Sequence, residues 1–124
     1  MTLIHGELSE QILGCCVRVH RQLGLGFREK ISGEALGLEL AKVGLNYERQ
    51  KAIVINYDEK SVGEHRLDLL VKSKVVVELK ACSAIGGGYL APARSDLKAT
   101  GLQLARVVNF ARPTLDIKRV VLTN

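Results

Sequence analysis

The chain has 124 residues, 47% of them hydrophobic and 25% charged, which is enough for one domain with a single modest core. Its net charge of +5 is compatible with a polyanionic partner, whereas the absence of Trp and the scarcity of Tyr and Phe argue against a base-stacking surface for single strands. No apolar run approaches the ~20 residues of a membrane span and the chain starts without a signal-peptide pattern, so we expect a soluble, cytoplasmic protein that does not enter a membrane.

Two amphipathic helices are predicted in the first part of the chain. Apolar residues recur at steps of three and four over residues 8–23, and a glycine at position 24 ends this pattern. A second helix is predicted over residues 29–43, with Gly44 as its C-terminal stop. Two of the three cysteines are adjacent within the first helix, which fits small buried side chains in a reducing compartment better than a disulfide framework.

The rest of the chain predicts strands around one more helix. Three strands joined by polar turns are expected over residues 46–57, 62–71 and 75–81. A third helix over residues 92–100 follows a triple glycine, and it admits Pro92 because proline is tolerated in a first turn. Two more strands are expected over residues 104–110 and 117–122. This order predicts one α/β domain over residues 1–124, with a central mixed sheet and helices against its faces.

An acidic residue stands before the predicted hairpin, and an acid-x-base triplet follows it. If the turn centres on Ser73, Asp68 lies directly across from Glu78, and the alternation of side chains brings Lys80 to the same face. Two carboxylates in this position are roughly 5 Å apart at Cβ and repel each other, so they need a cation or a proton. Hard oxygen ligands suit Mg²⁺ or Mn²⁺, and a nearby lysine polarises a water or stabilises negative charge on a phosphate.

The alternative is an ordinary solvated hairpin face. In that case Arg66 and Lys80 form surface ion pairs with the two acids, each worth ~0 to 1 kcal/mol. The neighbouring residues 69–71 and 75–77 are apolar at successive positions, which is typical of strands covered on both faces. Charges at the end of such strands favour a functional site.

These residues and the order of elements resemble the PD-(D/E)xK nuclease superfamily, and more closely its small GxxExxY family. The blocks that carry the resemblance include Arg66-Leu67-Asp68-Leu69-Leu70-Val71 and Val77-Glu78-Leu79-Lys80-Ala81. Further blocks lie at residues 19–29, 34–36, 39–40, 44–45, 48–50, 97–102, 109–110 and 118–121, so the resemblance extends over nearly the whole chain.

The resemblance implies a restriction-endonuclease-like core and metal-dependent cleavage of nucleic-acid phosphodiester bonds. It implies that Asp68 and Glu78 hold Mg²⁺ or Mn²⁺, that the backbone carbonyl of Leu79 adds a ligand, and that Lys80 positions or activates the attacking water. Glu29 matches the helical acid of the superfamily, which reaches the metal through water. The alternative for Glu29 is a favourable interaction with the helix dipole, worth ~0.3 to 1 kcal/mol.

Three positions depart from the family pattern. Ser32 stands where the family has its Tyr, and Pro92 and Asp96 stand where it has Gln and Tyr in the third helix. The superfamily often places substrate-facing polar groups there. An alternative function is therefore a catalytically impaired module that binds nucleic acid or a protein partner, including a second copy of the chain.

Two basic residues of the third helix, Arg94 and Lys98, are four positions apart and share one helix face. We expect this face to lie near the carboxyl end of the hairpin strands, where it would bind the phosphate backbone of a nucleic acid. The alternative is a solvated helix face without a ligand.

Overall fold

A five-stranded mixed sheet with helices on both faces forms the fold in the computed structural model, which describes residues 4–123. The elements in chain order are α1 (Gly6–Leu23), α2 (Glu29–Lys42), β1 (Tyr47–Tyr57), β2 (Lys60–Val71), β3 (Val75–Lys80), α3 (Leu90–Thr100), β4 (Leu104–Asn109) and β5 (Asp116–Val121). Strands follow the order β1-β2-β3-β4-β5, and all neighbours are antiparallel except β3 and β4. Helix α3 makes the crossover that this parallel pair requires.

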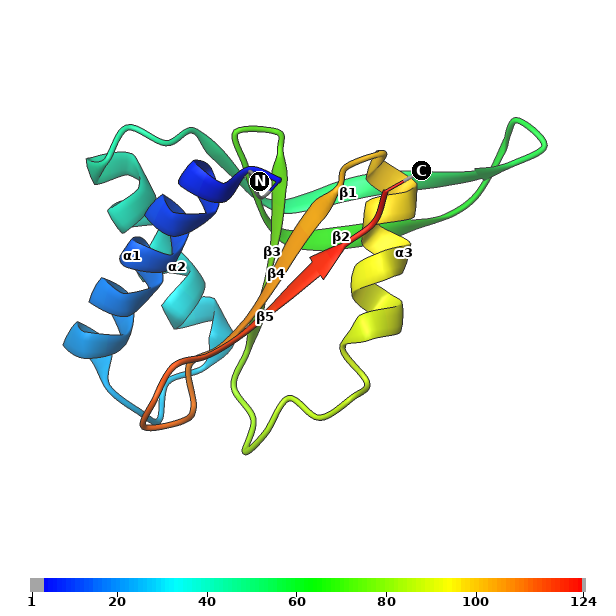
Figure 1. The fold of residues 1–124 in the computed structure, drawn as a ribbon. Coiled ribbons are helices and arrows are strands. Elements are labelled where there is room, and N and C mark those ends of the chain that lie inside the picture. Colours follow the sequence, from blue (N-terminus) through cyan, green and yellow to red (C-terminus); the bar gives the residue numbers. More distant parts are fainter. Residues whose placement is uncertain (1–3, 124) are drawn as a thin grey trace.

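The helices cover opposite faces of the sheet, with α1 and α2 on one side and α3 on the other (Figure 1). Val75, Val77 and Leu79 of β3 pack with the core on the α1 and α2 side, whereas Val76 packs with the residues of α3. Successive residues of a strand point to opposite faces, so a strand covered on both sides is apolar at every position. The apolar runs in the sequence therefore reflect two cores that share one sheet.

The predicted class and order of elements are confirmed, and the boundaries differ by a few residues. Helix α3 begins at Leu90, two residues before Pro92, so the proline lies in the first turn as expected. Strand β2 begins at Lys60 and is longer than predicted. None of the helices in residues 4–123 is both long enough and apolar enough to cross a membrane.

The turn between β2 and β3 has the predicted centre. Leu69 pairs with Val77 and Val71 with Val75, so the register is symmetric about Ser73. Lys72 and Ser73 have φ angles of 52° and 54°. Two successive left-handed residues are typical of a tight hairpin turn whose twist matches that of the strands.

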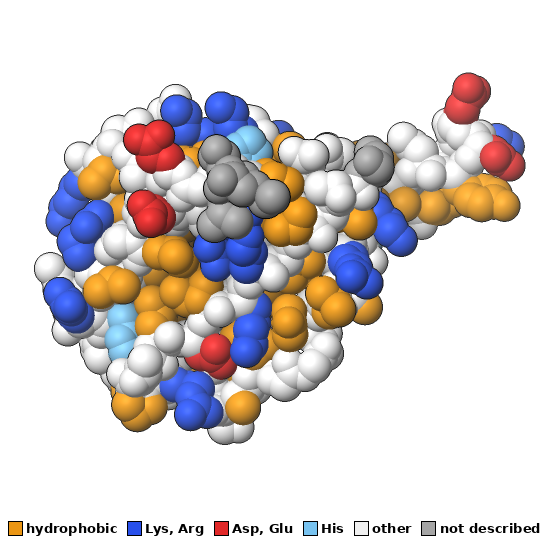
Figure 2. Space-filling view, in the orientation of Figure 1, with side chains coloured by type: hydrophobic (Ala, Val, Ile, Leu, Met, Phe, Trp, Pro, Cys, Tyr) orange, Lys and Arg blue, Asp and Glu red, His pale blue; other side chains and the backbone are white. Residues whose placement is uncertain are grey.

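Strands β1 and β2 continue well past the rest of the sheet as a two-stranded arm (Figures 1 and 2). Their pairing extends from Tyr47 with Val71 to Tyr57 with Lys60. The outer half of the arm exposes Val54, Tyr57 and Val62. The base of the arm, by contrast, lies between the two cores and carries Asp68.

Candidate functional site

Strands β2 and β3 separate at the predicted acids and form a fork in the sheet. Their ladder ends at Leu69 and Val77, one position before the pair that would join Asp68 to Glu78. Asp68 instead directs its carboxylate to the backbone of β3, where the Leu79 N–H donates a hydrogen bond of 2.8 Å to Asp68 Oδ2. The side chain of Asp68 thus takes the place of a backbone partner for β3 and is fixed at the fork.

The ladder on the other side of β2 is distorted at the same position. The pairs between β1 and β2 pass from Arg49 with Leu69 to Lys51 with Leu67 and omit Gln50 and Asp68. Gln50 has a φ of 51°, which is uncommon for a residue other than glycine. The backbone of β1 is therefore bent beside Asp68, and such conformations concentrate at functional sites.

Glu78 lies on the α3 side of the fork, in contact with two other carboxylates. Burial chiefly, together with the contact with Asp96 and the negative charges of Asp68 and Asp96, raises the pKa of Glu78 to about 10. Glu78 Oε1 is buried and has no hydrogen-bond partner among the residues that the structure describes. A buried, unpaired carboxylate oxygen among negative charges fits a site that a cation or a proton completes.

Asp96, one of the three departures from the family pattern, lies in this cluster of carboxylates. Asp96 is 8% exposed, and its Oδ1 lies 3.0 Å from Nδ1 of His65 on β2. The sequence carried a signal for this position. Ala93 and Leu97 are apolar at helical spacing around Asp96, so the three residues lie toward the same side of α3, which faces the sheet.

Glu29 reaches the fork from the α2 side. It is the first residue of α2, and the backbone N–H of Ala81, just after β3, donates a hydrogen bond of 3.1 Å to Glu29 Oε1. Glu29 and Asp68 line one cavity of about 480 Å³, whose wall consists of Glu29, Lys30, Glu34, Arg49, Gln50, Asp68 and Leu79. The predicted helical acid and the predicted strand acid therefore share one cavity.

Lys80 is the last residue of β3, and its side chain is exposed. Because side chains alternate along a strand, Lys80 points to the same side of β3 as Glu78. Its ammonium group is therefore accessible to a molecule that enters the fork.

The donors at the fork make an incomplete metal site by themselves. Within residues 4–123, no three His, Cys, Asp or Glu side chains are grouped so that they alone would hold a metal ion. Mg²⁺ commonly takes one or two carboxylates and completes its shell with water and substrate phosphate. Asp68 and Glu78 match that smaller set, with oxygen donors of the required kind.

The two basic residues predicted on α3 lie away from the acids. Each residue of a helix advances by about 100°, so Arg94 and Lys98, two positions before and after Asp96, lie on the opposite side of α3 from it. Both are exposed, and Lys98 borders a shallow cavity of about 500 Å³ together with His65. The structure therefore places these residues on the helix that carries Asp96, but not beside the fork.

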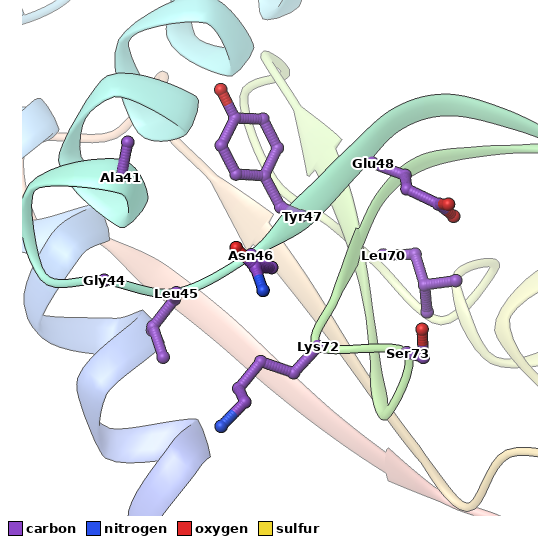
Figure 3. Close-up of a pocket in the computed structure, with 9 residues that line it drawn as sticks. All are labelled: Ala41, Gly44, Leu45, Asn46, Tyr47, Glu48, Leu70, Lys72 and Ser73. Carbon is purple, nitrogen blue, oxygen red and sulfur yellow. The ribbon is translucent and has the colours of Figure 1, made fainter.

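A larger cavity, of about 690 Å³, lies at the other end of β2 and β3 (Figure 3). It is bordered by the C-terminal end of α2, the start of β1 and the β2–β3 turn, including Tyr47, Lys72 and Ser73. None of the predicted catalytic residues lines it. Size alone therefore does not identify the site, and the chemistry of the side chains favours the fork.

Comparisons with known proteins bear on the family and the fold of the chain. A family model of the PD-(D/E)XK nuclease superfamily matches residues 6–120. No curated protein matches the chain. The fold is similar to that in the crystal structure of SSO0001, with a TM-score of 0.58 and 17% sequence identity, over 74% of this chain and 48% of that chain. The chain thus spans about half the length of SSO0001, and the predicted restriction-endonuclease-like fold is confirmed.

Proposed function

Because the chain belongs to the PD-(D/E)XK nuclease superfamily, we propose that it is a metal-dependent nuclease that hydrolyses phosphodiester bonds in DNA or RNA. The observation that carries this proposal is the fork between β2 and β3. It joins the Asp68 carboxylate to the Leu79 backbone and leaves a buried oxygen of Glu78 without a hydrogen-bond partner among the described residues. Placement of these groups at the end of β3 supports a centre for phosphate chemistry.

Asp68 and Glu78 would hold Mg²⁺ or Mn²⁺, and the backbone carbonyl of Leu79 would add an oxygen ligand. Such an ion, when bound, polarises the phosphate and lowers the pKa of a coordinated water. The hydrogen bond from the Leu79 N–H orients Asp68 before any ligand arrives. This fixed orientation reduces the rearrangement that binding requires.

Lys80 and Glu29 are the remaining catalytic groups of the proposal. The exposed ammonium of Lys80 orients the attacking water and stabilises the negative charge that builds up on the phosphate during the reaction. Glu29, held by the Ala81 N–H, lines the cavity that contains Asp68 and would reach a bound ion through water. Within the superfamily we assign the chain to the GxxExxY family, on the sequence blocks described above.

The alternative is a module that binds nucleic acid or a protein partner without cleaving it. Asp96 favours this alternative, because it adds a third carboxylate beside Glu78 at a position where the family has Tyr. Ser32, which replaces the other Tyr, is buried and presents no phenol to a substrate.

A panel of single-stranded and double-stranded DNA and RNA distinguishes these functions. We expect the native chain to cleave at least one substrate with Mg²⁺ or Mn²⁺ and none in the presence of EDTA. Asp68→Asn should abolish cleavage while the circular dichroism spectrum stays native. Binding without cleavage under all conditions would contradict the nuclease proposal and support the alternative.

The second proposed element is a phosphate-binding surface formed by Arg94 and Lys98. Changing both residues to Glu should weaken nucleic-acid binding by about tenfold or more and reduce the dependence of affinity on salt, because fewer counterions are released. The control is the double variant Lys60→Glu with Lys74→Glu, which reverses the charge of two exposed lysines, one on the β1–β2 arm and one in the β2–β3 turn. Equal losses in the two double variants would mean that only net charge matters.

A further inference from the structure

Arg49 of β1 extends into the cavity that contains Asp68 and Glu29. Its side chain is 20% exposed and packs against the first half of α2, where Gly33 leaves room for it. A Cβ atom at Gly33 would lie 2.8 Å from Nη2 of Arg49 and 3.1 Å from a methyl group of Leu79. The missing side chain at position 33 therefore lets a guanidinium lie close to the fork.

The guanidinium of Arg49 is only partly satisfied by the chain itself. Nη1 donates to Oε1 of Glu34, and Nε is buried without a partner among residues 4–123. A guanidinium carries five N–H donors in one plane, an arrangement that matches the geometry of a phosphate. Because Nε is enclosed, a phosphate in the cavity would reach this guanidinium through its Nη groups, one of which Glu34 holds.

The ion pair between Glu34 and Arg49 can be displaced by another anion. The Glu34 side chain is 66% exposed, so its carboxylate keeps most of its contact with water and the ion pair is weak. A phosphate that enters the cavity competes with this carboxylate for the same N–H groups. Lys30 on the same wall adds a second positive charge, which offsets the acids for an incoming anion.

Resting on the proposed nuclease function, we propose that Arg49 binds a phosphate of the nucleic-acid backbone at the fork and that Glu34 occupies Arg49 until the substrate arrives. Arg49 then positions the strand that passes the proposed metal centre, on the α2 side of the sheet. The ligand is a phosphodiester group, so the contact is independent of base sequence.

Two substitutions test this role in a chain that also carries Lys80→Ala, which slows cleavage so that binding can be measured. Arg49→Lys keeps the charge but loses the planar set of N–H donors. It should weaken binding of the most tightly bound oligonucleotide by about tenfold, with an unchanged dependence of affinity on salt. Glu34→Gln removes the competing carboxylate and should tighten binding by about threefold. The matched control is Glu48→Gln, which removes one exposed acid of β1 outside this cavity.

The outcomes separate this inference from the proposed function. If Arg49 has only a packing role, Arg49→Lys lowers the melting temperature and leaves the dissociation constant unchanged, and Glu34→Gln does not differ from Glu48→Gln. That result overturns the phosphate role while native cleavage of the panel still supports a nuclease. If the native chain neither binds nor cleaves any substrate, both proposals are overturned.

Discussion

Replacing Glu78 by Gln should raise the stability of the metal-free protein, although it removes a proposed metal ligand. The pKa of Glu78 is raised from 4.5 to about 10 in the folded chain, chiefly by burial. Between these values the folded protein holds a proton that the unfolded chain releases, so stability falls as pH rises through this window. Gln has nearly the same shape and no charge to bury. We expect a gain of about 1–3 kcal/mol at pH 8 and a flatter dependence of the melting temperature on pH.

Manganese should narrow the difference in melting temperature between the two proteins. A cation beside Asp68 and Glu78 compensates the charges that destabilise the native chain, so saturating Mn²⁺ should raise its melting temperature by about 3–6 °C. Glu78→Gln should show almost no increase. Glu48→Gln, which neutralises an exposed acid away from the fork, serves as the control and should respond as the native chain does. Equal increases in Glu78→Gln and the native chain would refute the proposed metal site.

Lys80→Ala should reduce Mg²⁺-dependent cleavage by about 100-fold or more, because Lys80 acts on charge that develops only in the transition state. The exposed side chain makes no contribution to either core, so the melting temperature and its response to Mn²⁺ should stay close to native values. Single-turnover rates on the cleaved substrate measure the effect.

The matched control for Lys80 is Lys74→Ala, an exposed lysine in the turn at the other end of β3. It should leave the rate unchanged. Native-like cleavage by Lys80→Ala would point to another catalytic site or to a contaminating nuclease.

The fold was predictable because periodicity and turn chemistry act locally. Because β3 has a core on each of its faces, residues 75–77 are all apolar. The spacing around Ser73 predicts the hairpin register, which the structure confirms. The order of elements and the family resemblance then led to the correct α/β class.

The details of the site were less accessible, because they depend on how the elements are rotated and bent. Asp96 enters the cluster only through the orientation of α3 on the sheet, and the same orientation turns Arg94 and Lys98 away from it. The left-handed backbone at Gln50 has no marker in the sequence, since the conformation normally favours glycine. Arg49 lies in one of the blocks that resemble the family, but its place beside Asp68 depends on a close approach to Gly33 that the sequence does not reveal.

The arm formed by β1 and β2 has a consequence for local stability. At its base, Leu67 packs in one core and Leu69 in the other. Near its tip, Val54, Tyr57 and Val62 remain in contact with water. Opening the tip exposes little additional apolar surface, so the hairpin frays from its end at a small fraction of the free energy of global unfolding. Amide hydrogen exchange should therefore slow progressively from the Asp58–Glu59 turn toward Leu69, and the slowest amides of β2 should be those at its base, between the two cores.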